Sequence, residues 1–91
     1  MTHKFTLYLA GEESIKSLEI ITCVRDHLTE RLKGKFTLTV VDVIKFPELA
    51  RKEEIFVTPS WVRDLPKPKR KIIGNFCAKN NVIKGLDIFL E

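Results

Sequence analysis

Two cysteines and two histidines are the side chains with the most evident chemical potential in this 91-residue sequence. A reactive thiol needs a lowered pKa, which proteins obtain at a helix start or in a C-x-x-C motif. Cys23 and Cys77 stand far apart and form no such motif, and they are too few for a secreted disulfide framework. His3 and His27 are also far apart, and no further ligands cluster around them. We therefore expect no catalytic residue, no metal site and no cofactor.

The start of the first expected helix is the place where a redox thiol would be activated. That start reads Gly11-Glu12-Glu13-Ser14, so it has no cysteine, and its two carboxylates oppose a thiolate. Ser14 could hydrogen-bond the thiol of glutathione, but helix N-capping is its simpler role. Cys23 falls in mid-helix and is expected to be a small, partly buried side chain. The sequence therefore disfavours a thiol enzyme.

A basic stretch in the last third of the chain raises the question of nucleic-acid binding. Prolines stiffen this stretch, and Trp61 is the one nearby aromatic side chain that could stack on a base. Charge runs are usually solvated turns, and Glu53 and Glu54 dilute the positive charge. We therefore do not expect a nucleic-acid partner. The basic residues are Arg63, Lys67, Lys69, Arg70 and Lys71, with Lys79 further along.

Composition is typical of one small globular domain covering residues 1–91. Hydrophobic residues make up 44% and charged residues 31%, with a formal net charge of +4. No apolar run reaches the roughly 20 residues of a membrane span. The first residues also lack the apolar core of a signal peptide, so we expect a cytoplasmic protein.

Periodicity in the first half predicts a βαβ unit. Residues 5–10 alternate with a period of two, which predicts a strand. Ser14 is the expected N-cap of a helix over residues 15–32, and Gly34 follows its end. The β-branched residues 36–43 predict a second strand, parallel to the first. The helix carries an apolar stripe of Ile15, Leu18, Ile21, Val24, Leu28 and Leu32.

The second half is predicted to continue with a short helix, two strands and a final segment of mixed character. Pro47 opens a helix over residues 47–52, and residues 71–74 form the last expected strand. Between them, a strand around Trp61 begins at or after Pro59, because proline cannot sit inside a central strand. Residues 64–69 form a turn stiffened by two prolines. Residues 82–90 favour a helix, although a strand is a near-equal alternative.

The Thr58-Pro59 dipeptide directly before a strand is typical of the cis-proline loop of thioredoxin-like domains. Only about 5–6% of X–Pro bonds in folded proteins are cis, so the dipeptide alone would favour an ordinary trans proline. The predicted order β-α-β-α-β-β-α is that of thioredoxin, which makes Pro59 a candidate cis-proline.

The sequence resembles the KaiB family over residues 5 to 91. The matching segments occur in order and are nearly ungapped, which makes the set far more specific than the Thr-Pro dipeptide. They are Leu7-Tyr8-Leu9-Ala10-Gly11, Leu38-Thr39-Val40-Val41-Asp42-Val43, Pro47-Glu48-Leu49-Ala50, Thr58-Pro59, Leu65-Pro66, Arg70-Lys71-Ile72-Ile73-Gly74 and Gly85-Leu86-Asp87.

This resemblance implies a regulatory protein without catalysis that binds a KaiC-type ring ATPase. It implies partner contacts at Lys45, Arg70 and Lys71. It also implies two folds, an oligomeric βαββααβ form and a thioredoxin-like βαβαββα monomer that binds the partner. Gly85 and Asp87 match family positions that tune this change, although Asp87 is equally well an exposed carboxylate on a helix. A dimer or tetramer is the implied resting form.

Some positions depart from the family pattern. Glu19 and Glu54 stand where the resemblance implies basic residues that contact partners, and reversed charges at an interface rim weaken binding to an unchanged partner surface. Cys77 and Ala78 replace a Ser-Asn pair that would cap the last helix. A stand-alone oligomeric regulator that does not bind KaiC is therefore the alternative function.

Overall fold

The protein is described by a computed structural model over residues 2–74, and it begins with the expected βαβ unit. Strand β1 (His3–Leu9) leads into helix α1 (Ile15–Leu32) and then into strand β2 (Phe36–Asp42). A short helix, α2 (Pro47–Lys52), precedes strands β3 (Ser60–Leu65) and β4 (Arg70–Ile73). The order β-α-β-α-β-β agrees with the thioredoxin-like prediction. The ambiguous segment 82–90 lies outside the described residues.

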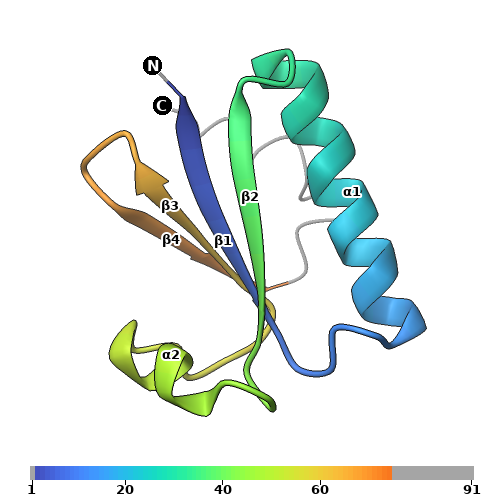
Figure 1. The fold of residues 1–91 in the computed structure, drawn as a ribbon, viewed down its shortest axis with the longest axis vertical. Helices are drawn as coiled ribbons and strands as arrows, with labels where there is room; N and C mark the ends of the chain where they lie inside the picture. Colours follow the sequence, from blue (N-terminus) through green and yellow to red (C-terminus); the bar gives the residue numbers. More distant parts are fainter. Residues whose placement is uncertain (1, 75–91) are drawn as a thin grey trace.

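The four strands form one sheet in the order β2-β1-β3-β4. β1 and β2 are parallel, as predicted, with Leu7 opposite Val40. β3 runs antiparallel to both of its neighbours and places Trp61 opposite Leu7. α1 lies along one face of this sheet, whereas α2 lies near the end where β1 and β2 finish and β3 begins (Figure 1).

The main core fills the space between α1 and the sheet. Phe5 and Trp61 meet there with ring centroids 5.6 Å apart. Because side chains alternate along a strand, the intervening residues form a smaller cluster on the other face. That second cluster consists of Tyr8, Val41 and Val62, with Val43 and Ile55 packed against it. The main cluster consists of Phe5, Leu7, Leu9, Ile20, Val24, Leu28 and Trp61.

Helix α1 begins where the sequence predicts, but its buried face is rotated. The Ser14 side chain accepts a hydrogen bond from the Ser17 N–H at 3.1 Å, which is the expected N-cap. Ile15 and Leu18, predicted to belong to the apolar stripe, are exposed, and Ile20 is buried instead. The prediction that Ile15 and Leu18 belong to the buried stripe was wrong, because the helical period alone does not determine which side of a helix meets the sheet.

Strand β3 begins directly after Pro59, as predicted, and the Thr58–Pro59 peptide bond is cis. β3 extends to Leu65, so Asp64 belongs to the strand rather than to the predicted turn. There the Thr6 hydroxyl donates to Asp64 Oδ2 at 2.7 Å across the sheet. This hydrogen bond continues the strand beyond the point where sequence composition indicates a turn.

Candidate protein-docking surface

Large apolar side chains are exposed around α2. Among the described residues, eight large hydrophobic side chains are exposed, and five of them come from α2 and its two flanking loops. Their exposed fractions range from 44% for Leu49 to 87% for Phe56. Exposed apolar residues that gather in one place mark interaction surfaces more often than exposed single residues do. We call Ile44, Phe46, Leu49, Phe56 and Val57 the docking surface.

Local structure explains why these side chains face outward. Pro47 suits the first turn of a helix, and the following turn buries Ala50. After the helix, the Ile55 N–H bonds to the Ala50 carbonyl at 2.8 Å, and Ile55 packs against the second cluster. With Ile55 anchored on the sheet, the next residues, Phe56 and Val57, are left exposed.

The exit from α2 is a Schellman turn built around Glu54. The Glu54 N–H bonds to the Arg51 carbonyl at 3.1 Å, and the Ile55 N–H bonds to the Ala50 carbonyl at 2.8 Å. Glu54 has a φ of 58°, in the left-handed region that usually belongs to glycine at this position. Glu54, whose charge departs from the pattern that the resemblance implies, therefore also has a strained backbone conformation.

Substituting Glu54 by glycine should raise the free energy of unfolding by up to about 1 kcal/mol. Glycine has no Cβ and adopts this φ without strain, so the turn is relieved while the backbone hydrogen bonds are kept. Urea denaturation of wild type, Glu54→Gly and Glu54→Ala measures the effect. Equal stability of the glycine and alanine variants would contradict it, because alanine removes the same charge but keeps the strain.

Glu53 fixes the end of α2 to strand β4. Its carboxylate lies 2.9 Å from Lys69 Nζ, and its backbone carbonyl accepts a hydrogen bond from Lys71 Nζ. Lys69 also lies 3.9 Å from Asp64. The pKa of Lys69 is raised above its usual value, and the hydrogen bond to the Glu53 carboxylate is the main cause. These contacts join the docking surface to the β3–β4 hairpin.

On the other side of α2, Asp42 joins the end of β2 to the β1–α1 loop. Its side chain is only 3% exposed. It accepts hydrogen bonds from the backbone N–H groups of Gly11, Glu12 and Ile44 at 3.1, 3.1 and 2.9 Å. Backbone hydrogen bonds hold the pKa of Asp42 below its usual value, although burial opposes this. The N–H of Glu12 has the largest effect, and those of Gly11, Ile44 and Lys45 add to it.

The stability that Asp42 contributes should be lost at acid pH. A depressed folded-state pKa means that the contribution is complete above the unfolded pKa of about 3.9 and disappears as the pH falls through the folded value. The gap in unfolding free energy between wild type and Asp42→Asn should therefore shrink below about pH 4. Urea denaturation over a pH series measures this gap. A gap that persists to the lowest pH at which the fold survives would contradict the assignment.

The predicted partner-contact residues Lys45, Arg70 and Lys71 have different surroundings. Lys45 lies 3.5 Å from Glu12 and 3.7 Å from Glu13. These carboxylates raise the pKa of Lys45, and the charge of Glu13 is the main cause. Lys71 binds the Glu53 carbonyl, and Arg70 is exposed on β4. Only Lys45 lies within the segments that carry the docking surface. Gly85 and Asp87, the predicted fold-switch positions, lie outside the described residues.

The basic stretch does not form one continuous cationic surface. Arg63 is buried, and its Nη2 donates to the Pro68 carbonyl at 2.9 Å. Burial first, then the nearby Arg70 charge, lowers the pKa of Arg63. Lys69 and Lys71 are engaged with Glu53. Because these basic side chains already contact a carbonyl or a carboxylate of the protein, they are less suited to bind the phosphates of a nucleic acid.

The described residues at the place that would hold a thioredoxin-type active site include a serine and no cysteine. A cavity of about 210 Å³ lies between the start of α1 and the cis-proline, and its lining includes Ser14, Lys16, Ser17 and Pro59. Ser14 caps the helix there, and no cysteine lines this cavity within the described residues. Among residues 2–74, the cavity therefore has no thiol in its lining that could attack a disulfide.

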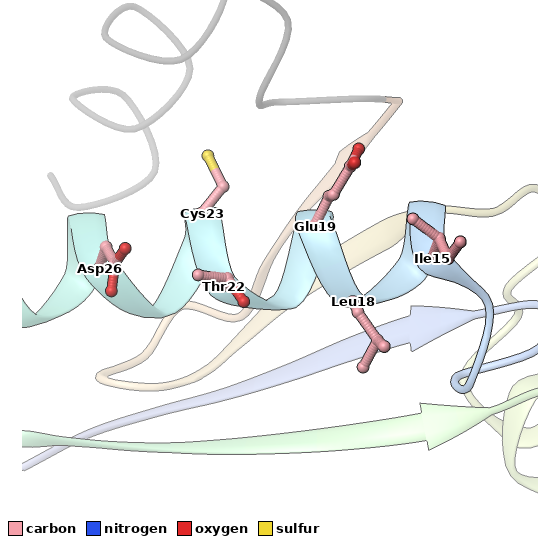
Figure 2. Close-up of a pocket in the computed structure, with 6 residues that line it drawn as sticks. All are labelled: Ile15, Leu18, Glu19, Thr22, Cys23 and Asp26. Carbon is pink, nitrogen blue, oxygen red and sulfur yellow. The ribbon is translucent and has the colours of Figure 1, made fainter.

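A second cavity, of about 510 Å³, lies on α1. Its lining comes from the helix residues Ile15, Leu18, Glu19, Thr22, Cys23 and Asp26. Figure 2 shows Glu19 and Cys23 projecting from one side of α1, whereas Leu18 projects from the opposite side. Cys23 is partly buried, as predicted, but it is disulfide-bonded rather than a free thiol.

Residues 2–74 contain neither a cluster of metal-binding side chains nor a helix that could span a membrane. In this part of the chain, no group of three or more acidic, histidine or cysteine side chains could hold a metal ion. Neither described helix combines the length and apolar character required to cross a membrane.

Comparison with solved structures identifies the fold as thioredoxin-like. The N-terminal domain of SasA from Synechococcus elongatus superimposes with a TM-score of 0.78 at 20% identity, covering 99% of this chain and 84% of that one. Chloroplastic thioredoxin z gives a TM-score of 0.67 at 17% identity, covering 98% and 79%. At such identities the likeness concerns the fold alone.

Sequence comparison then identifies the family. The model of the KaiB domain matches residues 6–88. The circadian clock oscillator protein KaiB of Prochlorococcus marinus strain SARG is 38% identical over 90 residues, covering 99% of this chain and 76% of the relative. The KaiB protein of Microcystis aeruginosa is 37% identical over the same length, covering 99% and 86%. The chain belongs to the KaiB family.

Proposed function

We propose that this protein is a non-catalytic, clock-type regulator that binds a KaiC-type ring ATPase through the docking surface. The observation that carries the proposal is the exposure of Ile44, Phe46, Leu49, Phe56 and Val57 on one helix and its flanking loops. Interface centres are apolar and rich in aromatic side chains, and two of these five residues are phenylalanine. Membership of the KaiB family supports a clock-related partner.

The electrostatics of the rim favour a partner of mixed charge. Lys45 is offset by Glu12 and Glu13 on the entry side of α2, and Lys69 by Glu53 on the exit side. A rim that is internally balanced provides little long-range attraction, so apolar contact supplies most of the affinity. Glu54 adds an exposed negative charge next to Phe56, which favours a basic side chain opposite it on the ATPase.

Analytical gel filtration of the full chain with a purified KaiC-type ring ATPase tests this function. The expected result is that the protein co-elutes with nucleotide-loaded rings as a stable complex. In the control run without rings, it should elute at its own size. The proposal is wrong if no complex forms with the ring in either its ATP-bound or ADP-bound state at tens of micromolar, roughly the weak end of useful affinities.

Self-association is the alternative use of the same surface. An exposed apolar area around α2 is also what a homodimer would cover, and obligate dimer interfaces are the more apolar class. Light scattering over a concentration series distinguishes the two. A dimer or tetramer that persists when the ring is added in excess would favour the stand-alone oligomeric regulator.

The protein should have no thiol–disulfide oxidoreductase activity. The cavity beside Pro59 contains Ser14 where a redox protein needs a thiolate, and Cys23 lies elsewhere on α1. Turbidity assays of insulin reduction with dithiothreitol should match the uncatalysed rate. Rates typical of an enzyme that disappear in Cys23→Ser would contradict this.

A further inference from the structure

The buried carboxylate of Asp42 joins the β1–α1 loop to the β2–α2 loop, which carries part of the docking surface. Asp42 is the last residue of β2, and its two carboxylate oxygens have different partners. Oδ1 accepts the Gly11 N–H at 3.1 Å and the Ile44 N–H at 2.9 Å. Oδ2 accepts the Glu12 N–H at 3.1 Å. Three backbone donors from two separate loops are therefore satisfied by a side chain that is 3% exposed.

The backbone of Asp42 holds the same segment a second time. Its carbonyl accepts the Phe46 N–H at 2.9 Å, immediately before α2 begins. Ile44 and Phe46, the two docking residues of this loop, thus both donate their backbone N–H groups to Asp42. The side chain of Lys45, the residue between them, reaches toward Glu12 and Glu13 on the β1–α1 loop.

This arrangement fixes the backbone of the loop that carries the two apolar side chains. The Ile44 N–H donates to the Asp42 carboxylate, a charge-assisted hydrogen bond of the stronger kind, and the Phe46 N–H donates to the Asp42 backbone carbonyl. An apolar residue at position 42 would leave three N–H groups without an acceptor in a buried place, so the loop would have to rearrange to find other partners.

We propose that Asp42 is a positioning residue of the docking surface, which holds Ile44 and Phe46 in the orientation that a partner meets. The proposal rests on the proposed function, because it concerns how the same surface is presented. Asp42 itself is buried and touches no partner. It acts through the loop, so its replacement should change binding without removing any contact atom.

Two replacements separate its hydrogen bonds. In Asp42→Asn the carboxamide oxygen can keep the Oδ1 position, which serves Gly11 and Ile44, while the NH2 group faces the Glu12 N–H as an opposed donor. In Asp42→Ala all three bonds are lost. Val24→Ala is the matched control, because Val24 is buried on α1 in the main core, and its truncation lowers stability away from the loop.

Amide hydrogen exchange of the three full-length variants tests the positioning directly. In Asp42→Ala, exchange at Gly11, Glu12 and Ile44, which lose their shared acceptor, should accelerate by about tenfold or more beyond the change seen across the main core. In Asp42→Asn, Glu12 should exchange faster while Ile44 remains close to wild type. Acceleration that is uniform along the chain, as expected for Val24→Ala, would overturn the proposal.

Titration of a purified KaiC-type ring with the variants then links the loop to binding. The affinity of Asp42→Ala should fall by about tenfold or more, that of Asp42→Asn by less than about threefold, and that of folded Val24→Ala should be unchanged. Faster exchange at Ile44 with wild-type affinity would overturn the proposal. If wild type itself does not bind, the proposed function is wrong, and the exchange data alone decide whether Asp42 fixes the loop.

Discussion

Replacing Ile44 and Phe56 together by aspartate should weaken binding to the KaiC-type ring at least about 100-fold while leaving the fold intact. The two side chains are 70% and 87% exposed, so the fold gains little from them. At an interface centre, a hot-spot side chain is worth about 2 kcal/mol or more, and a buried unpaired charge adds a further cost. Ring titration by fluorescence anisotropy measures the loss.

The matched control for this variant is Ile15→Asp. Ile15 is 78% exposed, but it lies at the start of α1 and outside the docking surface. An acidic residue in the first helical turn is compatible with the helix dipole, so the control should fold normally. It should bind the ring like wild type. If Ile15→Asp lost as much affinity as the double variant, the partner would meet α1 rather than the loops around α2.

Trp61→Ala should lower the free energy of unfolding by about 3–5 kcal/mol, the largest stability effect expected from one substitution in this chain. Trp61 is 2% exposed on β3 and packs on Phe5 with an interplanar angle of 48°. Truncation removes the aromatic contact and leaves a cavity between α1 and the sheet, which small domains have little reserve to tolerate.

Urea denaturation followed by far-ultraviolet circular dichroism measures this loss. Phe56→Ala is the control, because it removes an aromatic ring of similar size from an exposed position and should change stability by only about 0.5 kcal/mol. Comparable losses for the two variants would mean that Phe56 is packed in solution. The docking surface would then be smaller than the structure indicates.

Local sequence signals located the helices well. Ser14 as an N-cap and the basic turn before Gly34 bound α1 at Ile15–Leu32, as predicted. Pro47 likewise begins α2, and Pro59 sets the start of β3. These signals work because capping and proline geometry depend on a few adjacent residues. Segment matches along the whole chain also identified the family correctly.

Strand ends and the buried side of α1 were less accessible to sequence analysis. β1 begins at His3, because its partner β2 extends the pairing to Phe36. Ile15 and Leu18 fit the helical period but remain exposed, since the rotation of α1 on the sheet places Ile20 inside. Such outcomes depend on contacts between elements, which no single segment contains.

The amino-acid sequence by itself determined the family, the element order and the absence of a thiol at the start of α1. Tertiary structure alone decided the candidate site. The docking surface joins residues from two loops and a helix, and Asp42 gains its role because β1 and β2 end side by side. In the sequence, Asp42 is one acidic residue that follows two valines. Only folding removes it from water and brings the N–H groups of Gly11 and Glu12 to it, because hydrogen-bond donors distant in sequence meet when parallel strands finish at the same edge.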